Sequence, residues 1–177
     1  MSEIETERLV LRRPQPDDVD ALLEFAGDAE TMRWLGGEPG GRAVAARMVD
    51  GWLGRWEANG VGYFVVLLDG DAIGRVGLNV WDLSVGEIST YARAGEHAGT
   101  ELAWGLTSRY WGHGYATEAA RAARDWAYRE RGIERLVSMI EPANAASARV
   151  AKRLDALAGE QVQTPYGPMD VWVHPRP

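Results

Sequence analysis

A single stretch, residues 102–123, sets the strongest limit on the fold, because an apolar strand pattern there passes through the segment RYWGHG into an alanine-rich helical pattern. Gly114 precedes the helix where Ser, Asp or Asn would be the preferred cap. A helix N-terminus leaves several N–H groups unpaired and carries about half a positive charge. Gly112 and Gly114 allow a phosphate to approach the backbone, and Arg109 adds a permanent cation. The loop favours a diphosphate-bearing ligand, although a ligand-free glycine turn explains the same residues.

Other ligand-binding motifs fit this chain less well. For a Rossmann dinucleotide loop, Thr117 stands where the third glycine belongs. The chain has no Gly-x-x-x-x-Gly-Lys-Ser/Thr and no Gly-x-Ser-x-Gly pattern. Its three histidines, His97, His113 and His174, lack metal-ligand spacing, so no metal site is expected.

The order of helical and strand patterns predicts an α/β fold in one domain, residues 1–177. Strands are predicted at 8–12, 63–68, 72–80, 100–107, 134–140, 158–163 and 169–173, and helices at 17–26, 42–58, 115–130 and 145–154. Asp69-Gly70 is a strong hairpin signal, residues 36–41 form a glycine-rich break, and 81–99 are ambiguous, with a strand one option at 88–92. Tyr115, Ala119, Ala122 and Trp126 share one side of their helix and are expected to face the sheet. This order implies a sheet with helices on its faces.

Charge and composition narrow the partners. The net charge of −7 argues against nucleic acid and mildly favours an amine substrate. The chain has no cysteine, its first residues do not resemble a secretory signal, and its longest apolar run, 63–68, is too short to cross a bilayer. We therefore expect a cytoplasmic protein with no membrane association. A homodimer is compatible with the sequence, which leaves the oligomeric state open.

Three segments together resemble the GNAT superfamily of N-acetyltransferases, specifically its ribosomal-protein N-terminal acetyltransferase (RimJ/RimL-like) branch. They are ELAWGLTSRYWGHGYATEA at 101–119, PANAASARVAKRL at 142–154 and TERLVLR at 6–12. The resemblance extends over nearly the whole chain. It implies the GNAT fold, a mixed, mostly antiparallel sheet whose central strands splay apart to hold the pantetheine arm of acetyl-CoA, with helices on both faces.

The resemblance also implies a set of cofactor-binding residues. Backbone groups around Leu106 and Ser108 would bind the pantetheine arm, and Asn144 would contact it. The diphosphate would be held by the loop and the first turn of the following helix, at Arg109, Trp111, Gly112, His113, Gly114, Tyr115, Ala116 and Thr117. One departure is Asp155, which stands where the family has glycine after Lys-x-Leu. Because Asp tolerates a left-handed turn less well than Gly, we expect that helix to end differently.

Acetyl transfer to an amine needs a proton acceptor, a polarised carbonyl and a proton donor for the thiolate. Glu101 shares a strand face with Ala103 and Gly105, which leave space, and is the candidate base; Glu87 and Glu141 are weaker rivals. A solvated glutamate at a strand end is the competing interpretation. Ser147 is the candidate proton donor by analogy with the branch, although it could also simply face solvent in the first turn of a helix. Asn144 is well placed to cap that helix, and a backbone N–H near Leu106 is expected to stabilise the carbonyl oxygen.

The sequence indicates an amine as the acceptor and leaves two kinds open, a peptide N-terminus or a small molecule. Among the tryptophans, Trp126 and Trp172 are expected in the core, and Trp104 and Trp111 beside the cofactor strand and loop. One or two of Trp34, Trp52 and Trp56 are hypothesised to wall the acceptor pocket, although core packing explains each as well. A non-catalytic protein that binds or senses acyl-CoA is the alternative function. A nucleotide-binding regulatory domain is disfavoured by the missing motifs.

Overall fold

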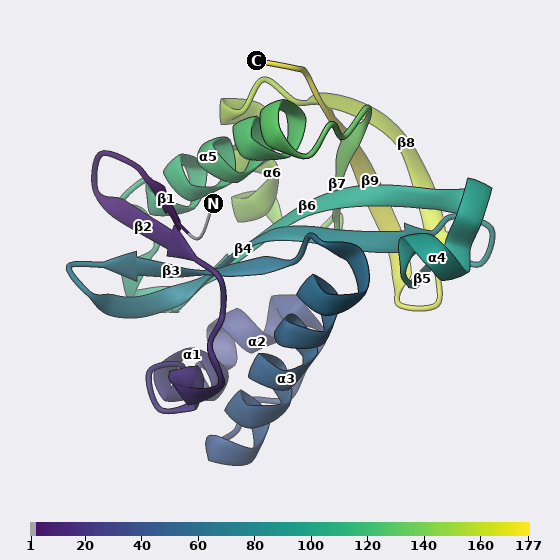
Figure 1. Ribbon diagram of the computed structural model, residues 1–177. Helices are drawn as coiled ribbons and strands as arrows, with labels where there is room; N and C mark the ends of the chain where they lie inside the picture. Colours follow the sequence, from purple (N-terminus) through teal and green to yellow (C-terminus); the bar gives the residue numbers. More distant parts are fainter. Residues whose placement is uncertain (1–2) are drawn as a thin grey trace.

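The computed structural model describes residues 3–177, in which one mixed sheet carries nine strands (Figure 1). The strands run β1 Glu3–Glu5, β2 Leu9–Arg12, β3 Tyr63–Leu68, β4 Asp71–Asp82, β5 Glu87–Ile88, β6 Ala98–Leu106, β7 Leu136–Ile140, β8 Leu157–Thr164 and β9 Gly167–His174. Their order is β1-β2-β3-β4-β6-β7-β9-β8, with β5 paired to β4. Among the described strands β6 and β7 are the only parallel neighbours, so the predicted mixed, mostly antiparallel sheet is confirmed.

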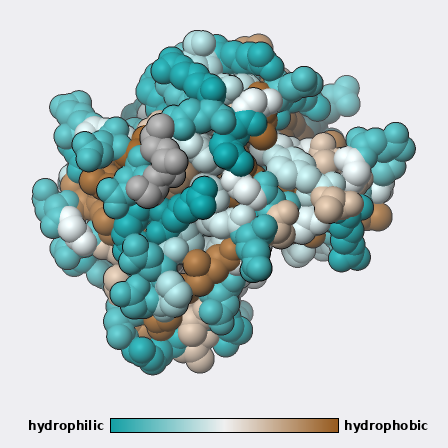
Figure 2. Space-filling model, in the orientation of Figure 1, coloured by the Kyte–Doolittle hydropathy of each residue, from teal (hydrophilic) through white to brown (hydrophobic). Residues whose placement is uncertain are grey.

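Helices cover both faces of the sheet, as predicted. They are α1 Leu23–Gly27, α2 Ala29–Leu35, α3 Arg42–Asn59, α4 Tyr91–Ala94, α5 Tyr115–Glu130 and α6 Ala145–Arg153, with 3-10 turns at Pro16–Val19, Gly95–His97 and Ser108–Tyr110. In the view of Figure 1, α5 and α6 lie above the sheet and α1, α2 and α3 lie below it. Figure 2 shows hydrophilic side chains over most of this side of the molecule, with apolar patches between them. No helix among residues 3–177 is long and apolar enough to cross a membrane.

The alternation of side chains along β3 divides the core into two layers. Phe64 and Val66 pack on the α5 side, whereas Tyr63 and Val65 pack on the α1 and α3 side with Trp52. On α5 the buried positions include Ala119 and Trp126, as predicted, together with Ala120 and Ala123, while Tyr115 and Ala122 are only partly buried. Small alanines on this face let α5 lie close to the sheet.

The prediction of one helix over 17–26 was wrong. The Asp18 carboxylate turns back to accept hydrogen bonds from Arg12, at 2.8 Å, and from the Gln15 N–H, at 2.6 Å, which closes a 3-10 turn instead. The chain then turns before α1 begins at Leu23. The next helix, α2, was missed; Asp28 caps it by accepting from the Glu30 N–H at 3.1 Å. The short strand β1 was also missed.

Two further expectations need correction. Of the optional strand at 88–92 only Ile88 is in a strand, as the second residue of β5, because the Thr90 side chain accepts from the Arg93 N–H and starts α4. Asp155 adopts the left-handed conformation, with φ of 60°, and its N–H donates to the Lys152 carbonyl at 3.0 Å. The expected difference at the end of α6 is therefore not found, since Asp155 takes the conformation for which glycine is usually needed.

Candidate active site

The site begins where β6 and β7 part. β6 pairs with β4 along its whole length, from Ala98 to Leu106, but pairs with β7 only at Thr100 and Glu101. Just beyond, the Ser138 hydroxyl donates to the Leu102 carbonyl at 2.5 Å and lies 2.8 Å from His174 Nε2. These contacts lie at the closed end of a fork between β6 and β7. Beyond them the two strands separate, which confirms the predicted splayed central strands.

A cavity of about 590 Å³ occupies the fork and extends to both sides of it. The free edge of β6 forms one wall. Its Leu102 and Leu106 carbonyls point to this edge, where Leu106 accepts from Thr31 Oγ1 at 2.8 Å and from Trp111 Nε1 at 2.7 Å. Since alternate residues of a strand direct both backbone groups to the same edge, the Trp104 N–H and C=O and the Leu106 N–H also face the fork.

The start of α5 opens into the same cavity, and its first N–H groups have no partner among residues 3–177. Gly114 is the N-cap, has φ of 84°, and provides no side-chain hydrogen bond to the first turn. Gly112 also has φ of 84°, and an added Cβ there would meet no atom within 4 Å, so the loop leaves room for a ligand. The Thr117 hydroxyl is buried and has no hydrogen-bond partner within residues 3–177. These features fit a phosphate group at this position.

Not all of the predicted loop residues reach the cavity. Those that line it are Trp111, Gly112, Gly114, Tyr115, Ala116 and Thr117, and outside the loop Leu106 and Asn144. Three others, Ser108, Arg109 and His113, are engaged elsewhere. The Ser108 N–H donates to Asp28, the Arg109 guanidinium pairs with Glu24 at 2.7 Å, and the His113 ring stacks on Tyr115.

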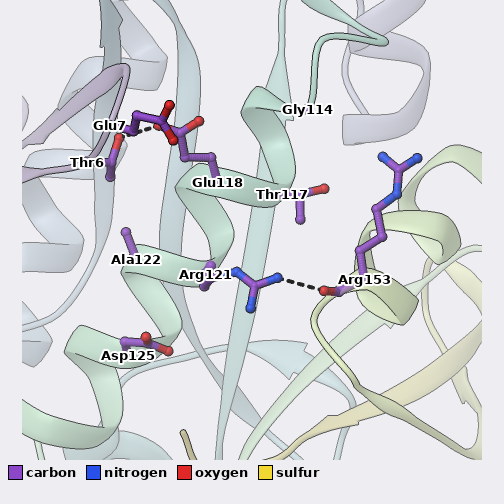
Figure 3. A pocket seen from close by; sticks show the side chains of 9 residues that line it. All are labelled: Thr6, Glu7, Gly114, Thr117, Glu118, Arg121, Ala122, Asp125 and Arg153. Carbon is purple, nitrogen blue, oxygen red and sulfur yellow. Dashed lines mark hydrogen bonds between the residues drawn. The ribbon is translucent and has the colours of Figure 1, made fainter.

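Two of the cations that line the cavity, Arg149 and Arg153, are on α6 and were not predicted. Arg149 and Arg153 are four residues apart, so they lie on one side of that helix. This spacing was the available signal. Figure 3 shows the Thr117 hydroxyl and the Arg153 side chain in a second, open pocket of about 550 Å³, which shares Gly114, Thr117 and Arg153 with the first.

Strand and helix contacts fix the loop before α5. The Arg8 side chain donates to Glu118 Oε2 through Nε at 2.7 Å and to the His113 carbonyl through Nη1 at 3.1 Å. Glu118 Oε1 also accepts from the Thr6 hydroxyl at 2.6 Å. Although partial burial opposes the charged form, these hydrogen bonds hold the pKa of Glu118 below its usual value. The first turn of α5 is thereby tied to the segment between β1 and β2.

Glu101 lies in the cavity wall at the fork, with 6% of its surface exposed. Its Oε2 accepts from Trp81 Nε1 at 2.7 Å and from Asn79 Nδ2 at 3.1 Å. Burial raises the pKa of Glu101, against the opposing effect of these donors and of the Arg75 charge. Asn79 and Trp81 were missed because they belong to β4, and only the β4–β6 register places Asn79 opposite Glu101.

Ser147 and Asn144 line the cavity from the start of α6. The Asn144 side chain accepts from the Ser147 N–H at 3.0 Å, so the predicted N-cap is confirmed. The Ser147 side chain is partly exposed. Of the rival carboxylates, Glu141 lines the cavity and is exposed, whereas Glu87 is exposed on β5 and is not part of the cavity wall.

The tryptophans divide between core and cavity. Trp126 and Trp172 are buried as predicted, and Trp104 and Trp111 line the cavity beside the β6 strand and the loop. Trp34 also lines it, on the side away from α5, together with Trp81, Ile88 and Tyr166. Trp52 and Trp56 are packed against other aromatic rings in the core. Of the three candidates for an acceptor wall, the cavity includes Trp34.

Comparison with known proteins points to one family. A family model described as an acetyltransferase (GNAT) domain matches residues 8–156. The chain is 28% identical over 151 residues to the uncharacterized N-acetyltransferase YnaD of Bacillus subtilis (strain 168), covering 85% of this chain and 80% of that protein. It is 28% identical to the solved acetyltransferase from Agrobacterium tumefaciens strain C58, with a TM-score of 0.78 and coverage of 99% and 95%. The ribosomal L7/L12 alpha-N-protein acetyltransferase RimL, solved with coenzyme A, shares the fold at 16% identity, with a TM-score of 0.78 over 98% of each chain.

Proposed function

This chain belongs to the GNAT family of acetyltransferases, and we propose that it transfers the acetyl group of acetyl-CoA to a primary amine. Acetyl-CoA is the co-substrate of this acetyltransferase. One observation carries the proposal: a single cavity joins the unpaired N–H groups of α5 to the free edge of β6 and to the buried carboxylate of Glu101. Because the three sequence motifs resemble the RimJ/RimL-like branch, a peptide N-terminus is one candidate for the acceptor. A small-molecule amine is the second candidate.

The proposed binding of acetyl-CoA uses both ends of the fork. The N–H groups from Gly112 to Thr117 would hold the diphosphate, with Arg149 and Arg153 as the nearby cations. The pantetheine arm would lie along the free edge of β6, where the backbone groups of Trp104 remain available. The carbonyl of Leu106 already accepts two hydrogen bonds, so the N–H of Leu106 is the backbone group left to bind acetyl-CoA.

The proposed chemistry is direct attack by the amine with help from two side chains. Glu101 accepts the amine's proton, directly or through a water, and its raised pKa brings its proton affinity closer to that of the amine. The Leu106 N–H stabilises the carbonyl oxygen as negative charge develops on it. The new C–N bond replaces the C–S bond, and the Ser147 hydroxyl gives a proton to the departing sulfur.

A thiol-release screen tests the proposal. Purified protein is given acetyl-CoA with peptides, amino acids, polyamines or aminoglycosides, and free thiol is measured over time. We expect release that depends on one class of amine, together with a mass increase of one acetyl group on that amine. Tight binding of CoA without amine-dependent release would contradict the proposal and favour an acyl-CoA-sensing role.

A further inference from the structure

Arg75 lines the cavity on the side of the sheet away from α5, on the same face of β4 as Asn79. Between them stands Gly77, which has no side chain and is paired with Ala103 of β6. The Arg75 guanidinium lies 3.8 Å from the centre of the Tyr63 ring, and Tyr63 is itself buried.

The Arg75 guanidinium has no carboxylate partner in the described part of the chain. No ion pair within residues 3–177 includes it, and its Nη1 atom is buried without a hydrogen-bond partner. The neighbouring Arg55 differs, because it donates to Asn79 Oδ1 at 2.9 Å and to the Gly51 carbonyl at 2.8 Å. A buried donor of a charged group left unpaired is unfavourable, so its retention points to a partner that arrives with the substrate.

We propose that Arg75 binds a carboxylate of the acceptor, so that the substrate is an amine carrying a carboxylate close to its amino group. The inference rests on the proposed amine acetylation. With the amine at Glu101, the acceptor carboxylate would meet the unpaired donors of Arg75 and satisfy them. A second cation, Arg33, also lines the cavity. Polyamines and aminoglycosides would bring further positive charges to these arginines and are therefore disfavoured.

Matched acceptor pairs test this inference. One pair is an amino acid and its carboxamide; the other is a pair of peptides with Asp or Asn at the second position. For wild-type protein we expect kcat/KM to be roughly tenfold to a hundredfold higher for the carboxylate member of at least one pair. The pair that responds distinguishes a free amino acid from an acidic peptide as the source of the carboxylate.

Substitutions of Arg75 distinguish recognition of the acceptor carboxylate from a general effect on Glu101. Arg75→Gln should reduce the carboxylate preference to near unity, Arg75→Lys should keep part of it, and Arg47→Gln, an exposed charge on α3, should leave it unchanged. If Arg75 only favoured the charged form of Glu101, the substitution Arg75→Gln would slow acetylation of both acceptors of a pair equally. This outcome overturns the inference. Equal kcat/KM for both members in the wild type overturns it as well, even if Arg75→Gln fails to fold. Absence of thiol release with every amine instead overturns the proposed function on which the inference rests.

Discussion

The Asn79 amide holds the Glu101 carboxylate through a hydrogen bond of 3.1 Å, and Arg55 determines which way that amide faces. Arg55 has only donors, so Asn79 must present its oxygen to Arg55 and its nitrogen to Glu101. The Tyr63 hydroxyl also accepts from the same nitrogen. The buried carboxylate is thus positioned by residues of β3, β4 and α3.

Replacing Asn79 by Asp would put a second carboxylate against Glu101. Like charges at this distance disfavour ionisation of both, so the pKa of Glu101 should rise further. We expect the acid limb of the pH–rate profile for Asn79→Asp to move to higher pH, with a loss of kcat at neutral pH. A profile superimposable on that of the wild type would exclude Asn79 as a positioning residue for the base.

Ser147→Ala should lower kcat by roughly tenfold or more without destabilising α6, if the hydroxyl gives a proton to the thiolate. The cap is preserved, because Asn144 accepts from the backbone of residue 147. Steady-state thiol release measures the effect, and Ser84→Ala, in the exposed turn between β4 and β5, is the matched control. Normal turnover with unchanged pH dependence would remove Ser147 from the mechanism.

Glu118→Gln should weaken acetyl-CoA binding while leaving acceptor preference intact. The substitution removes the charge that orders Arg8, and Arg8 in turn holds the His113 carbonyl of the loop. We expect KM for acetyl-CoA to rise roughly two- to fivefold, the range of a partly exposed ion pair. The same change at Glu130, at the exposed end of α5, serves as control. Equal KM values for the two variants would contradict a role for this ion pair in shaping the loop.

His174 should make the protein sensitive to acid. Burial, and to a lesser extent Arg124, lowers the pKa of His174 from 6.5 to about 4. Between these values the unfolded chain binds a proton that the folded chain does not, so stability falls as pH falls from about 6.5 to about 4, by at most about 3 kcal/mol. Denaturant unfolding of wild type and His174→Gln over this range measures it. The variant should lose much of the pH dependence, and identical slopes would contradict the assignment.

The parts of the site that could be predicted from sequence are those set by neighbouring residues. The loop before α5 follows from two glycines and an alanine-rich run, and the Asn144 cap follows from its place before α6. By contrast, the direction of Arg109 is set by Glu24, which lies far away in the sequence. The donors around Glu101 likewise depend on the pairing of β4 with β6. No local pattern contains these contacts, so they could not be predicted from the sequence.

The same distinction explains the errors in the fold. Asp17 and Asp18 are typical of a helix start, but the Asp18 carboxylate instead binds Arg12 at the end of β2. That contact between separate elements shortened the expected helix. The glycine-rich segment before α3 was predicted, whereas α2 just ahead of it depends on its Asp28 cap, which also binds the Ser108 N–H.

The pH–rate profile of Glu101→Gln, measured by thiol release with the best acceptor, tests the proposed mechanism most directly. The amide keeps an oxygen for Asn79 and Trp81, and removal of a buried carboxylate with a raised pKa should leave the protein at least as stable at neutral pH. We predict a rate loss of more than about tenfold, equivalent to about 1.4 kcal/mol, and loss of the limb that reflects the raised pKa of Glu101. The titration of the acceptor amine should affect the pH–rate profiles of the wild type and of Glu101→Gln alike. A smaller loss, with the wild-type pH profile retained, would show that Glu101 is not the base.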